Sequence, residues 1–157
     1  MEELWIKSAI QVAQMEELTD EEQGLLKRAI TATACSYAPY SHFHVGAAVL
    51  LQNGQIIEGC NQENVSYPAG ICAERSAIYA AGAQYPDTPI RMLAIAARNE
   101  EGELLKEPIS PCGICRQVMI ETEKRHQTPL HILLYGSDRI FVIEGVKQLM
   151  PLAFTDF

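Results

Sequence analysis

Basic residues are scarce in this chain. Its 157 residues include 12 Lys and Arg against 20 Asp and Glu, which gives a formal net charge of -8. Such a surface repels a polyanionic nucleic acid unless cations are locally concentrated. The densest basic group, Lys124 and Arg125 beside His126, is typical of the last turn of a helix, where it complements the helix dipole. The composition therefore argues against a nucleic-acid partner and favours a small, nearly uncharged substrate.

Long apolar runs are missing as well. No stretch approaches the roughly 18 apolar residues that a membrane-spanning helix needs. The first 18 residues carry four acids and one Lys, and they lack the basic start and unbroken apolar segment of a secretory signal. We therefore expect a cytoplasmic protein with no membrane partner. In that reducing compartment the five Cys predict metal ligands or buried thiols rather than disulfides.

Repeats, low-complexity tracts and linkers are also absent, so we expect one domain over residues 1–157. The alternation of Leu4, Ile6, Ile10 and Val12 predicts a strand within residues 3–12, although Trp5 and Ala9 on the other face leave a helix open as the alternative. The segment that begins at Thr19 contains a capping box, and the apolar spacing that follows predicts an amphipathic helix over residues 20–35.

The remaining elements alternate between strands and helices. The turn dipeptide Asn53-Gly54 lies between two apolar segments, 43–51 and 55–60, and predicts a β-hairpin. Ser110 as N-cap and Pro111 as first helical residue predict a helix through about residue 124. Composition predicts a helix over 72–83, strands over 92–97, 130–135 and 140–143, and a short helix that ends before residue 151. This order implies an α/β fold with a mixed sheet covered by helices on both faces.

Three cysteines lie where a metal site is expected. Cys72 begins one predicted helix, and Cys112 and Cys115 lie in the first turn of another. A helix N-terminus lowers the pKa of a thiol and favours the thiolate that zinc binds. A pair three residues apart can bind one tetrahedral metal, although alone it is equally compatible with a structural clip or a redox dithiol. Glu74, two residues after the first Cys, and the segment Pro111-Cys112-Gly113-Ile114-Cys115 together strengthen the metal interpretation.

The chain resembles the small homotetrameric zinc-dependent cytidine deaminases. Five blocks between residues 37 and 154 carry the resemblance: YAPYSHFHVGAAVL, GCNQENVSYP, GICAERSAI, SPCGICRQVM and LMPLAF. The Cys-x-Glu and Pro-Cys-x-x-Cys segments match the zinc nucleobase deaminase pattern, with Cys in place of the first His. The resemblance implies a three-layer α/β/α sandwich around a mixed five-stranded sheet. The N-terminal extension, residues 1–18, is longer than is usual in the family and leaves room for one extra strand.

The resemblance also implies the reaction and the assembly. It implies hydrolytic deamination of cytidine and deoxycytidine to uridine and deoxyuridine with release of ammonia, in pyrimidine salvage. One Zn²⁺ per subunit would be held by Cys72, Cys112 and Cys115, and Glu74 would carry protons between water, the pyrimidine N3 and the leaving amine. Arg75 would draw charge from the thiolates. Each subunit of the homotetramer would share its site with a neighbour.

Further roles follow from the same blocks. Asn61 and Glu63 would bind the ribose hydroxyls, and such buried polar groups reject a substrate that lacks the hydroxyls. The other substrate-binding candidates are Phe43 against the pyrimidine ring, Ala73 through its backbone, and Tyr67 and Phe154 at the boundary between subunits. For Asn64 a local turn is the preferred interpretation.

Three other functions stay open from the sequence. An enzyme that deaminates a related aminopyrimidine nucleoside antibiotic would share the zinc residues, although Asn61 with Glu63 argues against it. A non-catalytic structural zinc domain would need a fourth ligand, for which Cys60 is a candidate. A nucleic-acid deaminase is disfavoured by the acidic surface. Cys35 and Cys60 themselves are interpreted as buried packing thiols.

Overall fold

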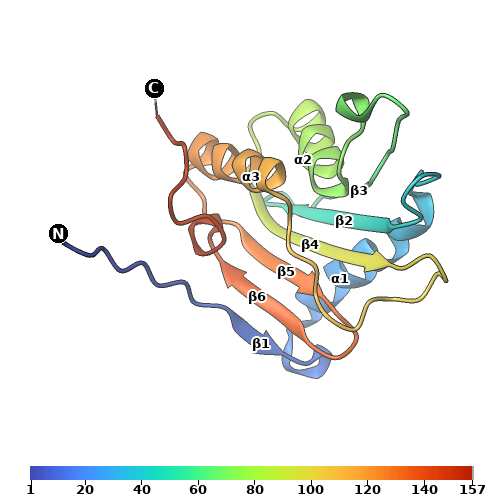
Figure 1. Cartoon of the computed structure of the whole chain (residues 1–157), viewed down its shortest axis with the longest axis horizontal. Helices are drawn as coiled ribbons and strands as arrows, with labels where there is room; N and C mark the ends of the chain where they lie inside the picture. Colours follow the sequence, from blue (N-terminus) through green and yellow to red (C-terminus); the bar gives the residue numbers. More distant parts are fainter. Residues whose placement is uncertain (157) are drawn as a thin grey trace.

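The computed structural model describes residues 1–156, and its centre is one mixed β-sheet (Figure 1). Six strands lie in the order β1-β6-β5-β4-β2-β3. Only β4 and β5 pair in parallel, and the other neighbours are antiparallel. The strands are β1 (Gln11–Ala13), β2 (His44–Leu51), β3 (Ile56–Cys60), β4 (Ile90–Arg98), β5 (His131–Tyr135) and β6 (Ile140–Glu144). The α/β class with a sixth, N-terminal strand is thus confirmed.

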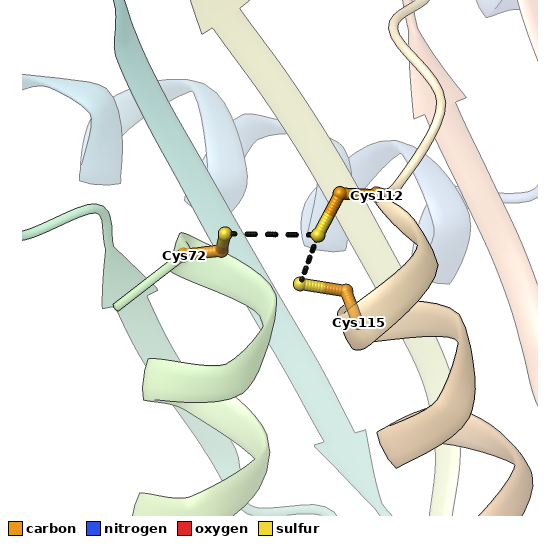
Figure 2. A group of neighbouring side chains, drawn as sticks. All are labelled: Cys72, Cys112 and Cys115. Atoms are coloured by element: carbon orange, nitrogen blue, oxygen red, sulfur yellow. Dashed lines mark hydrogen bonds between the residues drawn. The ribbon is translucent and has the colours of Figure 1, made fainter. Parts of the chain in front are cut away.

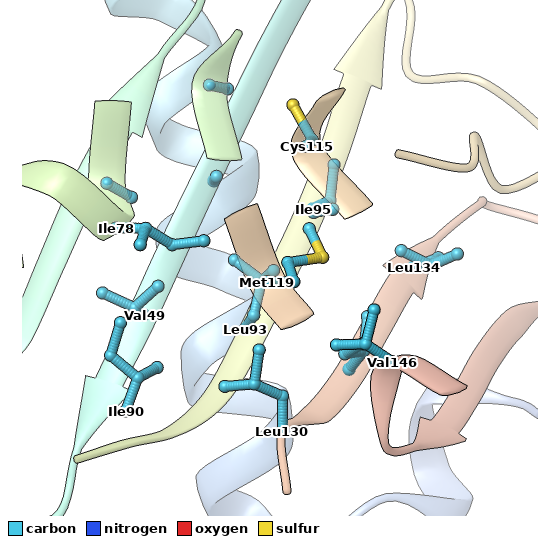
Figure 3. Packing of buried hydrophobic residues seen from close by; sticks show 14 of the residues in the cluster. Val49, Ile78, Ile90, Leu93, Ile95, Cys115, Met119, Leu130, Leu134 and Val146 are labelled. Atoms are coloured by element: carbon cyan, nitrogen blue, oxygen red, sulfur yellow. The ribbon is translucent and has the colours of Figure 1, made fainter. Parts of the chain in front are cut away.

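Three α-helices cover the two faces of the sheet. Helix α1 (Asp20–Ala32) packs on one face, and α2 (Ala73–Gln84) and α3 (Gly113–His126) lie side by side on the other, as Figure 1 shows. Each face has its own hydrophobic cluster. In the cluster under α2 and α3, Ile78 and Met119 meet Val49, Leu93 and Ile95 from the central strands (Figure 3).

The central strands are apolar because both of their faces are buried. In β2, Val49 belongs to the cluster under α2 and α3, whereas its neighbours Ala48 and Leu50 belong to the cluster under α1. The same alternation runs through β4, where Leu93 and Ala94 face opposite sides. A strand covered on both faces loses the polar alternation of a surface strand.

Glycine permits the close approach of a helix to each face. A Cβ atom at Gly46 would lie 2.1 Å from the carbonyl oxygen of Ala29 in α1. On the other face, a Cβ atom at Gly59 would lie 2.4 Å from the backbone nitrogen of Ala77 in α2. Both distances are far below van der Waals contact with rigid backbone atoms, so any side chain at these positions would displace a helix. Gly59 therefore fixes the position of α2.

Four boundaries differ from the sequence predictions. Within residues 3–12 only Gln11 and Val12 are in a strand, because residues 1–10 have no regular structure. The helix predicted over 20–35 ends at Ala32 and continues as a single 3-10 turn. The short helix near the C-terminus is also a 3-10 turn, over 146–148.

The start of α3 is the fourth difference. Cys112, and not Ser110, is its N-cap residue. The hydroxyl of Ser110 and the carbonyl group of Pro111 instead accept hydrogen bonds from Arg116. Among the described residues, no helix is long and apolar enough to cross a membrane.

Candidate active site

Two helix N-termini bring the three predicted thiols together. Cys72 is the N-cap residue of α2, and Cys112 is the N-cap residue of α3. Neither N-cap side chain accepts a capping hydrogen bond, so both thiols are free to face each other. The sulfur of Cys112 lies 3.9 Å from that of Cys72 and 3.5 Å from that of Cys115 (Figure 2). The sequence prediction that these residues converge is therefore confirmed.

The sulfur positions suit a tetrahedral metal. Zinc–thiolate bonds of about 2.3 Å in a tetrahedral site place sulfur atoms about 3.8 Å apart. The three sulfurs lie within 4.8 Å of one another, and they form the one such group of His, Cys, Asp or Glu among residues 1–156. Three ligands leave a fourth corner open, as in catalytic rather than structural zinc sites.

Cys60 is not a fourth ligand. Its thiol donates a hydrogen bond to the carbonyl oxygen of Cys35, 3.1 Å away, and its sulfur does not belong to the group of three candidate ligands. Cys60 is partly buried, but Cys35 is exposed. The prediction that Cys35 is a packing thiol is wrong, because the residue lies in the exposed 3-10 turn that follows α1.

The thiols of Cys72 and Cys115 affect each other's ionisation. A hydrogen bond with the Cys115 thiol lowers the pKa of Cys72 to about 5; burial opposes this effect and Arg75 supports it. The thiolate of Cys72 in turn raises the pKa of Cys115, which is also buried. One thiolate therefore forms readily in the metal-free cluster, whereas the next needs a cation to stabilise it.

Arg75 lies one turn along α2 from Cys72. Its Nη2 atom donates to the sulfur of Cys72 at 3.7 Å. The Nε atom of the same guanidinium is buried and has no hydrogen-bond partner. A half-buried guanidinium that faces sulfur is the arrangement expected where more than one thiolate accumulates, because the cation offsets their negative charge.

Glu74 is the buried carboxyl group of the site. Glu74 is only 5% exposed, whereas most carboxylate residues of the chain are not buried. Burial raises the pKa of Glu74, and the negative charge of Cys72 adds to this rise. A carboxyl group with a raised pKa beside three candidate metal ligands is suited both to accept and to return a proton.

A pocket of about 620 Å³ opens beside the thiols. It contains both the reactive groups, Cys72, Cys112 and Glu74, and the residues predicted to bind substrate. The predicted residues that line it are Phe43, Asn61, Glu63, Tyr67, Ala73, Glu74 and Arg75. Cys115 lies behind this lining in the hydrophobic core. The volume is within the usual range for small-molecule sites.

Asn61 and Glu63 already have backbone partners. The side-chain oxygen of Asn61 accepts from the Val45 amide at 2.8 Å, and its nitrogen donates to the Phe43 carbonyl at 2.9 Å. The Glu63 carboxylate accepts from the amides of Tyr40 and Ser41 and from the Ser41 hydroxyl. Chiefly through the Ser41 hydroxyl, these bonds lower the pKa of Glu63. Both side chains are therefore held in fixed orientations at the pocket wall.

Phe154 is the predicted residue that the structure does not bring into this pocket. It lines a separate cavity of about 640 Å³ between α2 and α3. Its carbonyl oxygen accepts a hydrogen bond of 2.8 Å from Gln117, which holds the C-terminal segment against α3. The Phe154 side chain thus does not contribute to the site of its own subunit.

Two residues that contribute to the site were not identified from the sequence. Ser41 orients Glu63, and Arg116 binds the segment that leads into Cys112. Both lie inside blocks that carry the family resemblance, which was the available signal. Their roles depend on hydrogen bonds between distant segments, and spacing along the chain does not reveal such bonds.

Comparisons with known proteins agree with this geometry. Residues 19–128 match the family model described as the cytidine and deoxycytidylate deaminase zinc-binding region. A cytidine deaminase of Halalkalibacterium halodurans is 45% identical over 137 residues, which are 86% of this chain and 95% of that protein. One from Mycobacterium tuberculosis is 43% identical over 93 residues, 59% of this chain and 65% of that protein.

Solved structures show the same fold. The cytidine deaminase of Burkholderia pseudomallei is 36% identical with a TM-score of 0.73, and the match covers 87% of this chain and 100% of that one. The M. tuberculosis enzyme is 33% identical with a TM-score of 0.68, over 88% and 99% of the two chains. The chain belongs to the cytidine and deoxycytidylate deaminase family.

Proposed function

We propose that this protein is a zinc-dependent cytidine deaminase of pyrimidine salvage. It hydrolyses cytidine or deoxycytidine to uridine or deoxyuridine and ammonia. One observation carries the proposal: three thiols from two helix N-termini meet beside the buried Glu74 at a pocket of nucleoside size. Membership of the family, and relatives of similar length that are named cytidine deaminases, support it.

The donor set supports one zinc ion per subunit, held by Cys72, Cys112 and Cys115. When bound, the ion would supply a Lewis acid that lowers the pKa of water to about 7. Arg75 and the N-terminal dipoles of α2 and α3 offset the negative charge that three thiolates bring. Five free thiols also fit the expected reducing cytoplasm.

Glu74 moves the protons. Its carboxylate accepts a proton from the water that attacks C4 and donates one to N3, which makes C4 more electrophilic. Glu74 then takes the proton of the new C4 hydroxyl group and transfers it to the departing amino group, so the tetrahedral intermediate collapses to the C4 carbonyl and ammonia leaves. The low polarity around Glu74, which raises its pKa, suits a group that must be charged at one step and neutral at the next.

The pocket wall selects a nucleoside. After the bonds to Phe43 and Val45, the Asn61 amide retains one N–H and one lone pair, and Glu63 retains acceptor capacity for a ribose hydroxyl. Phe43 packs on the pyrimidine ring, and the backbone of Ala73 contacts its polar edge. Because an antibiotic analogue with an altered sugar would leave these groups unpaired, the nucleoside is the preferred substrate.

We further propose a homotetramer with shared sites. Two large hydrophobic side chains support it: Tyr67, 82% exposed at the rim of the pocket, and Phe154, 65% exposed and outside its own subunit's pocket. A neighbouring subunit would cover both. Sedimentation of the native protein tests this assembly. A fully active monomer would contradict it.

The decisive experiment combines metal analysis with the loss of cytidine absorbance. We expect about one zinc per chain and turnover of cytidine and deoxycytidine. Glu74→Gln should retain zinc and lose at least about 100-fold in kcat, as expected on removal of a general acid-base group. Parallel assays with the antibiotic nucleoside and single-stranded DNA separate the alternatives. Zinc without turnover of any substrate, and no effect of Glu74→Gln, would instead establish a structural zinc domain.

A further inference from the structure

Arg116 binds the segment that carries one of the candidate zinc ligands. It follows Cys115 in the first turn of α3, and its side chain reaches back along the helix. Its Nε donates to the carbonyl oxygen of Pro111 at 2.8 Å, and its Nη2 donates to the hydroxyl of Ser110 at 2.9 Å. Both acceptors directly precede Cys112.

The bond to Pro111 acts on the direction of the Cys112 side chain. The Pro111 carbonyl belongs to the planar peptide unit that ends at the Cys112 Cα, so fixing this oxygen fixes the orientation of the whole unit. Cys112 is exposed, unlike the core residue Cys115. Packing therefore contributes little to the position of its sulfur, and the peptide unit before it has to supply the constraint.

The guanidinium itself has a second anchor. Its Nη1 donates to the carbonyl oxygen of Leu149 at 2.7 Å, immediately after the 3-10 turn Val146–Gln148. This turn is held on α3 because the Glu123 carboxylate accepts from the Val146 amide at 2.9 Å. The planar fork of an Arg side chain can satisfy three acceptors in fixed directions, which a Lys ammonium cannot reproduce.

We propose that Arg116 is a positioning residue for the metal site: it holds the peptide unit before Cys112 so that this sulfur stays in the tetrahedral arrangement with Cys72 and Cys115. The inference rests on the proposed zinc function. Arg116 itself does not line the pocket, and it acts on Cys112 through the Pro111 carbonyl group and the Ser110 hydroxyl, of which Ser110 does line the pocket.

Zinc affinity of the full-length protein, measured by chelator competition, tests the proposal. Arg116→Met should weaken zinc binding about 10- to 100-fold, the usual effect of losing a group that orients a metal ligand. Arg116→Lys should show a smaller loss. Arg125→Met is the matched control, because Arg125 also lies on α3 and donates to a loop carbonyl, that of Pro86, at 2.7 Å. It should bind zinc within about twofold of the parent protein.

A second readout separates positioning from general stability. With Co²⁺ in place of zinc, the thiolate-to-cobalt absorption bands should shift in Arg116→Met and stay unchanged in Arg125→Met. Ser110→Ala removes one of the three hydrogen bonds that Arg116 donates, so it should give a smaller shift of the cobalt bands. This variant still tests the proposal if Arg116→Met does not fold. The proposal would be overturned if Arg116→Lys and Ser110→Ala both kept the zinc affinity and the cobalt absorption bands of the parent protein. It would also be overturned if Arg125→Met lost as much zinc affinity as Arg116→Met. A parent protein that binds zinc without deaminating cytidine would refute the proposed function alone.

Discussion

Cys72 sets the charge of the metal-free thiol cluster. Its pKa of about 5 lies well below the ordinary thiol value of about 8.5, first because Cys115 donates a hydrogen bond to its thiolate and further because Arg75 lies nearby. The zinc-free protein should therefore be alkylated by iodoacetamide at Cys72 with a pH midpoint near 5. Below this pH the thiol is protonated and the rate falls. The measurement is mass spectrometry of modified peptides across a range of about pH 4 to about pH 9.

Variants of the two partners check the cause of this low pKa. Cys115→Ala removes the strongest hydrogen bond, so it should move the midpoint toward the ordinary thiol value, and Arg75→Met should move it less. Cys35→Ser is the control, because Cys35 is exposed in the turn that follows α1. If Cys115→Ala leaves the midpoint unchanged, the explanation by hydrogen bonding is wrong.

Asn61 has a structural task that its place in the motif does not reveal. Its amide joins the carbonyl of Phe43 to the amide of Val45 at the start of β2. Asn61→Ala leaves these partly buried backbone groups unpaired, and we expect a loss of about 1–3 kcal/mol in the free energy of unfolding together with a raised KM. Urea denaturation and steady-state kinetics measure the two effects.

Asn64 provides the comparison. Its side-chain oxygen accepts from the Ser66 amide at 2.9 Å in an exposed local turn, the interpretation preferred from sequence. Asn64→Ala should cost less than about 1 kcal/mol because water replaces the lost partner. Equal losses of stability in the Asn61 and Asn64 variants would show that the Asn61 amide contributes no more than a surface turn.

At the scale of elements, spacing predicted most helices and strands, and the errors have physical causes. The N-terminal alternation of Leu4 and Ile6 predicted a strand, but a strand needs a partner, and β6 pairs only with residues 11–13. The Ser-Pro signal misplaced the start of α3 because Arg116 engages Ser110 from within the helix. Local patterns describe what a segment can form, whereas distant hydrogen bonds decide where it begins.

The position of α2 depends on Gly59 in β3. A Cβ atom there would meet the Ala77 nitrogen at 2.4 Å and the Ala73 carbonyl oxygen at 2.6 Å, both backbone atoms of α2. Gly59→Ala should therefore push the N-terminal half of α2 away and displace Cys72. We expect a loss of about 1–3 kcal/mol in stability, typical of overpacking, and weaker zinc binding. Thermal unfolding and chelator competition are the measurements.

Gly24 is the matched glycine for this test. It lies inside α1, and a Cβ atom added there would meet no other atom within 4 Å. Gly24→Ala should therefore stabilise the protein by up to about 1 kcal/mol through helix propensity. Zinc affinity should be unchanged. If Gly59→Ala is as stable as the parent protein and binds zinc with the same affinity, helix α2 can move away from the sheet without a loss of stability.

For the molecule as a whole, the reactive groups could be identified from sequence but their surroundings could not. The family resemblance, carried by the Cys-x-Glu and Pro-Cys-x-x-Cys segments, implied which residues converge, and each segment lies at the start of one helix. The orienting bonds of Ser41 and Arg116 join segments that are close only after folding. The second cavity, between α2 and α3, was likewise invisible, since it depends on how the C-terminal segment lies on α3.

The N-terminal extension divides into two parts with different expected importance. Residues 1–10 have no regular structure, and Leu4 and Trp5 are more than four-fifths exposed, at 83% and 82%. A bond of 2.8 Å from the Ala9 amide to the Gln148 side chain ties this segment to the rest of the fold. Residues 11–18, in contrast, supply β1 and Leu18, which is buried in the cluster under α1.

Two deletions test this division. Removal of residues 2–10 should change the free energy of unfolding by less than about 0.5 kcal/mol relative to the full-length protein, because that segment buries little apolar surface. The value of kcat/KM should stay unchanged. Removal of residues 2–18 should cost at least about 2 kcal/mol, since it exposes the edge of β6 and the surface that Leu18 covers. Urea denaturation of both proteins gives the comparison. If the shorter deletion is as harmful as the longer one, the exposed apolar segment is buried in the native assembly, and its cover comes from another subunit.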